Sequence, residues 1–185
     1  MMRSLFIIMA LCFINSAQAM TVKHTDIRHQ NGRYYVHFNV LINADKHTVS
    51  TLMDDYNSWP QWSSVVNKVT ILKQTDARTS LVKLKLNSCL LFFCKSLKKL
   101  QTVTRIAPGH LVTITTKGNK DFRYAREVWY ARAEGGNTRL VYDAVMEPDF
   151  FVPPLMGRWL ISSRIRKALQ QSIAKLEQMA HHPAS

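Results

Sequence analysis

Three acidic residues are candidates for chemistry, but their spacing does not form a catalytic dyad. Asp54 and Asp55 are adjacent in the sequence. Neighbours on a helix point about 100° apart, so we expect these two to cap a helix or to be solvated. Glu127 shares a strand face with Trp129 and several alanines, and this face is expected to point inward. Glu127 either anchors the head group of a ligand or lies at a sheet edge and reaches solvent. The edge position is favoured, because the nearby arginines project from the opposite face and a buried carboxylate needs a partner.

The sequence lacks the motifs of the common catalytic and metal sites. It has no nucleophile elbow, phosphate-binding loop, paired-carboxylate motif or zinc pattern. His181 and His182 stand just before Pro183 in a C-terminal tail, with no partner nearby in the sequence. We therefore predict no catalytic residue, no metal site and no cofactor.

The N-terminal region has the pattern of an export signal. Arg3 supplies a positive charge, and residues 5–14 are apolar and too short to span a bilayer. Ala17-Gln18-Ala19 has the small-x-small pattern of a signal peptidase site, while the alternative is an uncleaved anchor. Cleavage after Ala19 would leave residues 20–185 in the periplasm or outside the cell.

Two cysteines remain after that cleavage, Cys89 and Cys94. Their C-x4-C spacing differs from the C-x-x-C of redox motifs and zinc sites. An exported chain meets an oxidising compartment, so the pair predicts a disulfide.

The segment between the cysteines is apolar, although loops are usually polar. It either folds back onto the long helix to complete the core, or forms an apolar tip that contacts a membrane or guards a cavity mouth. The membrane position is favoured, because basic residues next to an apolar tip suit an anionic surface. The basic residues are Lys95, Lys98 and Lys99. The predicted membrane-contact residues are Leu90, Leu91, Phe92 and Phe93.

The chain after residue 20 begins with a predicted hairpin and two short helices. Residues 22–30 and 33–42 flank Asn31-Gly32, a pair that tolerates positive φ in a type I′ turn. Asp45 is the predicted N-cap of the first helix, and Ser58 that of the second. Trp59 and Trp62, on the second helix, either line a ligand pocket or close the core.

The rest of the chain is a series of strands followed by one long helix. The six predicted strands are rich in Val, Thr, Tyr and Leu and are joined by short turns, which indicates an antiparallel meander. Their ranges are 65–74, 79–91, 92–106, 111–117, 124–133 and 138–146. Pro153-Pro154 precedes the helix. Its predicted apolar stripe is Ile161, Ile165, Leu169, Ile173, Leu176 and Ala180. The order predicts an α+β domain in which a curved sheet wraps the terminal helix.

This order resembles the START-like helix-grip fold (SRPBCC), the superfamily of polyketide cyclases, coenzyme Q-binding proteins and lipid-transfer domains. The resemblance covers roughly residues 33–179. Its motifs specify a fold better than a ligand. The matching segments are residues 40–45, 52–56, Trp59-Pro60-Gln61-Trp62, Trp129, Thr138-Arg139-Leu140 and Tyr142.

The resemblance implies a deep apolar cavity between the long helix and the sheet. Members of the superfamily bind lipids, sterols, isoprenoid quinones or polyketides, some are enzymes, and no catalytic residue is universal. A second apolar stretch, residues 150–156, would lie beside the cavity mouth, either as core cover or as a movable gate. The candidate ligand-binding residues are Trp59, Trp62, Leu84, Leu86, Ile114, Glu127, Trp129, Tyr142, Ala144, Phe151, Leu155, Trp159 and Ile161.

The length and net charge of the chain limit the number of domains and the kinds of partner. The 185 residues suffice for one domain with a real core, and the formal net charge of +13 falls to +12 when Arg3 is removed. The basic residues are scattered and match no nucleic-acid-binding motif, so we predict no nucleic-acid partner. An anionic membrane surface is the expected acidic partner, and plain solubility is the alternative.

We therefore predict an exported monomer that binds or transfers a lipid, isoprenoid or quinone. The alternatives are a cyclase- or hydrolase-like enzyme that uses the same cavity, and an envelope interaction module without a cavity. The predicted boundaries are a signal peptide at 1–19, an N-terminal hairpin strand at 20–32, the helix-grip domain at 33–180 and a disordered tail at 181–185.

Overall fold

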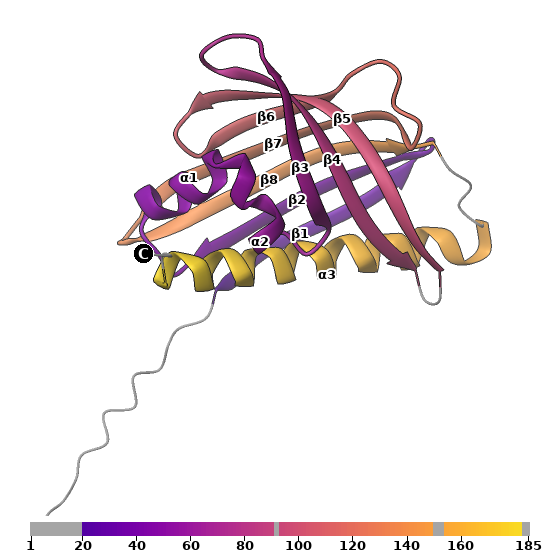
Figure 1. Ribbon diagram of the computed structural model, residues 1–185. Helices are drawn as coiled ribbons and strands as arrows, with labels where there is room; N and C mark the ends of the chain where they lie inside the picture. The colour runs from indigo at the N-terminus through magenta and orange to yellow at the C-terminus, as the bar shows by residue number, and fades with distance from the viewer. Residues whose placement is uncertain (1–19, 91–92, 150–153, 183–185) are drawn as a thin grey trace, which may run out of the picture.

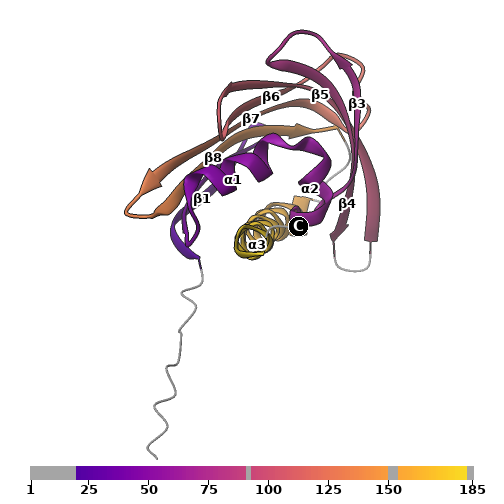
Figure 2. The same ribbon diagram turned by 60° about the vertical axis from the view of Figure 1, so that its left-hand side comes forward.

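The computed structural model describes residues 20–90, 93–149 and 154–182, with the backbone alone at 88–90, 93 and 154–158. These residues form an eight-stranded antiparallel sheet that curves around one long helix, α3 (Figures 1 and 2). The strand order is β1-β2-β8-β7-β6-β5-β4-β3. The strands are β1 (Thr21–Gln30), β2 (Arg33–Ile42), β3 (Val66–Gln74), β4 (Thr79–Leu90), β5 (Phe93–Ala107), β6 (His110–Thr115), β7 (Phe122–Glu134) and β8 (Asn137–Pro148). The helices are α1 (Lys46–Asp54), the 3-10 helix η1 (Tyr56–Ser58), α2 (Trp59–Trp62) and α3 (Pro154–His181).

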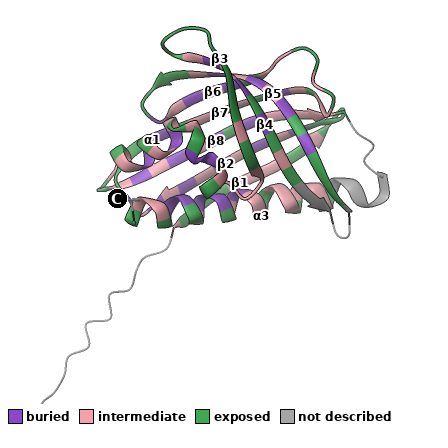
Figure 3. Cartoon of the chain, in the orientation of Figure 1, coloured by how far each residue is buried: buried purple, intermediate pink, exposed green. Residues whose placement is uncertain are grey.

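The predicted α+β helix-grip fold is confirmed, and so is the first hairpin. Asn31 and Gly32 have φ values of 51° and 76°, as a type I′ turn requires. Along β2, Tyr34, Phe38 and Ile42 are buried and alternate with more exposed residues (Figure 3). This alternation fixes which face of the sheet meets α3.

The two predicted short helices are present, but only one has a side-chain capping bond. The Asp45 Oδ1 atom accepts a hydrogen bond from the Thr48 backbone N–H at 2.9 Å, which caps α1. Ser58 occupies the predicted N-cap position of α2, but its side chain makes no capping hydrogen bond. Its hydroxyl donates instead to the carbonyl of Leu52 at 2.8 Å and ties η1 back to α1.

The predicted stripe of α3 forms its contact with the sheet. Leu169, Ile173 and Leu176 are buried in the same core cluster as Phe38 and Leu140. Each such side chain contributes about 1.5–3 kcal/mol through burial. Because α3 is buried along this face, it packs stably on the sheet. The space between α3 and the sheet is therefore bounded by two packed elements.

The two predicted disulfide cysteines lie at the ends of β4 and β5. Strands β4 and β5 extend beyond their neighbours, and their antiparallel register makes Cys89 and Cys94 direct partners (Figure 1). Leu91 and Phe92 lie outside the described residues, as do Phe151 and the rest of residues 150–153. In the described part of the chain no helix is both long and apolar enough to cross a membrane.

Candidate ligand-binding cavity

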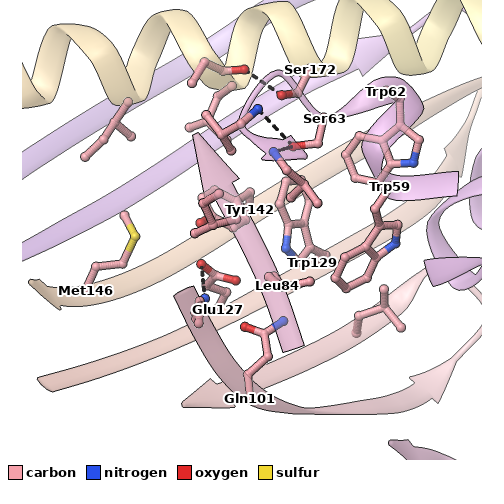
Figure 4. Close-up of a pocket in the computed structure, with 18 of the residues that line it drawn as sticks. Trp59, Trp62, Ser63, Leu84, Gln101, Glu127, Trp129, Tyr142, Met146 and Ser172 are labelled. Atoms are coloured by element: carbon pink, nitrogen blue, oxygen red, sulfur yellow. Dashed lines mark hydrogen bonds and ion pairs between the residues drawn. The ribbon is translucent and has the colours of Figure 1, made fainter. Parts of the chain in front are cut away.

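A cavity of about 200 Å³ lies between the concave face of the sheet and α3 (Figure 4). Strands β3 to β8 contribute its walls, α2 closes one end and α3 covers it. Most of its lining is apolar. The lining residues are Met53, Trp59, Trp62, Ser63, Val65, Val66, Leu84, Leu86, Lys99, Gln101, Leu111, Phe122, Glu127, Trp129, Tyr142, Met146, Ile165, Ala168, Leu169 and Ser172.

One wall is a continuous row of aromatic rings. The ring centroids of Trp59 and Trp62 are 6.5 Å apart, and Trp62 is 6.2 Å from Trp129. Trp129 is in turn 4.1 Å from Tyr142. The Trp59 indole N–H donates to the Met53 carbonyl at 2.9 Å, which fixes that ring on α1. The two buried tryptophan rings of α2 thus belong to the core and also line the cavity.

The polar end of the cavity is built around a buried ion pair. Lys99 Nζ lies 2.8 Å from a Glu127 carboxylate oxygen, and the two side chains are only 3% and 15% exposed. The Thr113 hydroxyl donates to the other oxygen of Glu127 at 2.9 Å. Glu127 therefore points inward with a partner, and the favoured expectation of a solvent-exposed edge residue was wrong. Lys99, expected beside the apolar loop as a membrane-facing cation, is also buried.

The charge state of this pair follows from its surroundings. Burial raises the pKa of Glu127, but the Lys99 ammonium and the hydrogen bonds from Lys99, Thr113 and Tyr142 outweigh burial and leave that pKa below its ordinary value. Burial together with the Glu127 charge holds the pKa of Tyr142 well above its ordinary value. At neutral pH the cavity therefore contains an ionised carboxylate that is fully engaged and a neutral phenol.

Gln101 is a cavity residue that the sequence reasoning missed. It is completely buried, and neither its amide nitrogen nor its amide oxygen has a hydrogen-bond partner among the described residues. The Trp62 indole N–H is likewise unpartnered there. One signal was available, because Lys99 and Gln101 fall at the same strand parity as apolar Leu97 and Val103 and therefore share their face of β5. Two polar residues on an otherwise apolar strand face indicate a polar site inside.

The structure brings together seven of the thirteen candidate ligand-binding residues. They are Trp59, Trp62, Leu84, Leu86, Glu127, Trp129 and Tyr142.

Four other candidates do not line the cavity. Ile114 is 40% exposed, because β6 turns Leu111 and Thr113 inward and the opposite parity outward. Trp159 is 79% exposed. Ala144 is part of the packed core, and Ile165, one turn further along α3, takes the place expected for Ile161.

The last two candidates cannot be placed in this way. Phe151 lies outside the described residues, and so does the side chain of Leu155. The same holds for the side chains of the predicted membrane-contact residues, 90–93.

Comparison with protein families gives one match that spans most of the chain. Residues 35–180 match the family described as polyketide cyclase / dehydrase and lipid transport. No curated protein sequence matches the chain significantly.

Solved structures with the same fold cover nearly the whole domain. The Zhui aromatase/cyclase from Streptomyces sp. R1128 has a TM-score of 0.66 at 12% identity, covering 81% of this chain and 94% of that one. A STAR-related lipid transfer protein from Xanthomonas axonopodis has a TM-score of 0.65 at 14% identity, covering 87% and 100%. A START superfamily protein from Mycobacterium smegmatis has a TM-score of 0.60 at 22% identity, covering 77% and 98%. At these identities the likeness establishes the fold.

Proposed function

Because the chain belongs to the polyketide cyclase/dehydrase and lipid transport family, we propose that it binds an apolar ligand in the cavity between the sheet and α3. One observation carries the proposal: the lining is mainly aromatic and aliphatic, with a few polar groups gathered around Glu127. Apolar burial supplies affinity in such sites, and a few polar groups orient the ligand. A filled core, as in a cavity-free interaction module, would leave no such space.

Binding is favoured over catalysis by the state of Glu127. A general acid or base works best when its pKa lies near the operating pH. The Lys99 ammonium and the hydrogen bonds to Glu127 move its pKa downward, away from neutrality. The cavity-lining residues named above include no histidine or cysteine that could take over the role. Among the described residues that line the cavity, a cyclase- or hydrolase-like activity therefore has no proton-transfer group matched to neutral pH.

The volume limits what enters without rearrangement. An engineered cavity of about 150 Å³ accepts a benzene ring. The cavity here, at about 200 Å³, accepts a ring or a short chain. A lipid, isoprenoid or quinone would place one such portion inside the cavity.

A dye-binding assay with a cavity-filling variant tests the proposal. The neutral dye N-phenyl-1-naphthylamine, which would place one of its ring systems in the cavity, should become fluorescent with the wild-type protein. Leu84→Trp, which places an indole in the cavity, should abolish the effect. Leu72→Trp is the matched control, because Leu72 is 50% exposed on β3. Equal dye binding by all three proteins would refute a cavity-bound ligand.

We also propose that the protein is exported and carries a Cys89–Cys94 disulfide. The support is the signal pattern of residues 1–19 and the register that makes the two cysteines direct partners. Intact mass of envelope-purified protein, measured before and after reduction, should give a chain that starts at Met20 and gains two hydrogens. A chain that still carries residues 1–19, or two free thiols before reduction, would contradict the proposal.

A further inference from the structure

The Gln101 amide is an unfilled hydrogen-bonding site inside the cavity. It is completely buried, points into the cavity in Figure 4, and has both amide atoms unpartnered among the described residues. Leaving a buried donor and acceptor unsatisfied costs free energy, and such groups in native proteins require an explanation. A ligand group that both accepts and donates would satisfy the amide nitrogen and the amide oxygen together.

The neighbouring charges exclude a charged group at this place. Lys99 and Glu127 are the charged residues among the cavity lining, and they already neutralise each other at 2.8 Å. An anionic ligand would have to compete with Glu127 for Lys99, and a cationic one would have to compete with Lys99 for Glu127. Burying a further charge without a partner is costly. The ligand group near Gln101 is therefore uncharged.

We propose that the cavity selects apolar molecules that carry a hydroxyl group, and that Gln101 recognises this hydroxyl. A hydroxyl donates to the amide oxygen and accepts from the amide N–H, which a ketone, an ether or a hydrocarbon does not do. This inference rests on the proposed function, because it names the ligand class for the same cavity.

Displacement of N-phenyl-1-naphthylamine by three eight-carbon probes tests the proposal. The probes are octane, 1-octanol and octanoate at pH 8, and the proteins are wild type, Gln101→Met and Leu86→Met. Gln101→Met keeps the length of the side chain and removes its polar atoms, whereas Leu86→Met changes another lining residue without changing polarity. The ratio of octanol affinity to octane affinity is measured for each protein, and the ratios are compared between proteins. The hydration free energies of the probes are the same for every protein, so they cancel in this comparison.

We expect Gln101→Met to lower the octanol-to-octane affinity ratio by roughly tenfold. The ratio for Leu86→Met should match wild type, and octanoate should displace the dye poorly from all three proteins. Gln101→Met should also raise the melting temperature of the ligand-free protein, because no buried amide is left unsatisfied. This rise separates a recognition role from a structural one, which would lower the melting temperature.

Other outcomes overturn the inference in distinguishable ways. Octane binding with an unchanged ratio in Gln101→Met would refute hydroxyl recognition and leave the proposed function standing. Octanoate binding as tight as octanol binding would refute the uncharged ligand. If neither octane nor 1-octanol displaces the dye from wild type, the proposed function fails together with the inference.

A second, independent feature lies at the start of β1. The Met20 backbone nitrogen lies 2.9 Å from one carboxylate oxygen of Glu177 on α3, and the Asn43 backbone N–H donates to the other oxygen at 3.0 Å. Glu177 is only 8% exposed. Cleavage after Ala19 would turn the Met20 amide into an ammonium group at this position. A buried carboxylate is stabilised far more by an ammonium than by a neutral N–H.

We infer that Glu177 is the receptor for the new N-terminus, so that removal of residues 1–19 locks β1 onto α3. The ammonium provides a charge partner for a carboxylate that otherwise has two amide donors. This inference rests on the proposed cleavage after Ala19, and processing then stabilises the mature fold.

Three forms of the chain test this inference, each freed from a fusion partner without extra residues. Residues 20–185 with a free amine should melt about 4 °C higher than residues 18–185. Acetylation of the Met20 amine should lower the melting temperature to that of the longer form. Glu177→Gln should remove the difference between the long and the short form. Equal melting of the free and acetylated forms, or a difference that survives Glu177→Gln, would refute the inference.

Discussion

The buried ion pair offers the sharpest test of how this cavity is held together. Lys99→Met removes the ammonium and leaves the Glu127 carboxylate, 15% exposed, with its hydroxyl donors alone. Breaking a buried pair by removing one partner costs about 3–5 kcal/mol. For a domain of this size that corresponds to a melting temperature about 10 °C lower. Lys98→Met, an exposed neighbour on β5, should change stability by less than about 0.5 kcal/mol.

The pH dependence of the unfolding free energy should differ in direction between wild type and Lys99→Met. In wild type the pKa of Glu127 is lowered on folding, so its contribution to stability is present above the unfolded pKa near 4.5 and is lost as the pH falls through the lowered value. In Lys99→Met, burial should raise the pKa of Glu127 above 4.5. Its penalty is then absent below pH 4.5 and grows as the pH rises through the raised value.

Urea unfolding of both proteins between pH 4 and 7 measures the effect. The free-energy cost of Lys99→Met should be largest at pH 7 and shrink toward pH 4. The double variant with Glu127→Gln should recover most of the loss at pH 7, because a neutral amide needs no ammonium. A cost below about 1 kcal/mol at pH 7, or one that does not vary with pH, would refute the view of a buried, ionised Glu127.

Three further predictions concern the scaffold and the surface. Gly109→Ala should cost roughly 2–3 kcal/mol of stability, because a Cβ at φ +72° would meet a serine hydroxyl of α1. Gly118→Ala, at φ +85° in open space, should cost about 1 kcal/mol. Chemical denaturation measures both costs, and equal values would exclude the contact at Gly109. Asp45→Ala should cost about 1 kcal/mol through loss of the α1 cap, and an unchanged unfolding midpoint would contradict the cap. The sequence also predicts that Phe92→Ser with Phe93→Ser weakens binding to anionic liposomes in flotation assays with little change in melting temperature, whereas normal flotation with early melting would indicate core residues.

The sequence was a reliable guide wherever a pattern is completed within a few neighbouring residues. Asn31-Gly32 specifies its turn because both positions need positive φ, and Asp45 caps α1 through an N–H three residues away. The alternation along β2 and the stripe of α3 each identify a buried face, because the periods of strand and helix differ. These local rules, combined in chain order, were enough for the fold class.

Pairings between distant strands were decided by tertiary structure alone. In β6, Leu111, Val112 and Ile114 are all apolar, so nothing in the sequence indicates which parity points inward. The register with β5, which shifts between Arg105 and Ala107, turns Thr113 in and Ile114 out. The same registers carry Lys99 to Glu127 across 28 residues. From the sequence alone, Lys99 is expected to be exposed, because it follows an apolar loop. Its burial is tolerated only because Glu127, two strands away in the sheet, neutralises its charge. The apolar wall of this cavity could thus be read from local periodicity, whereas its polar end exists only because sheet register places three strands' polar side chains at one point.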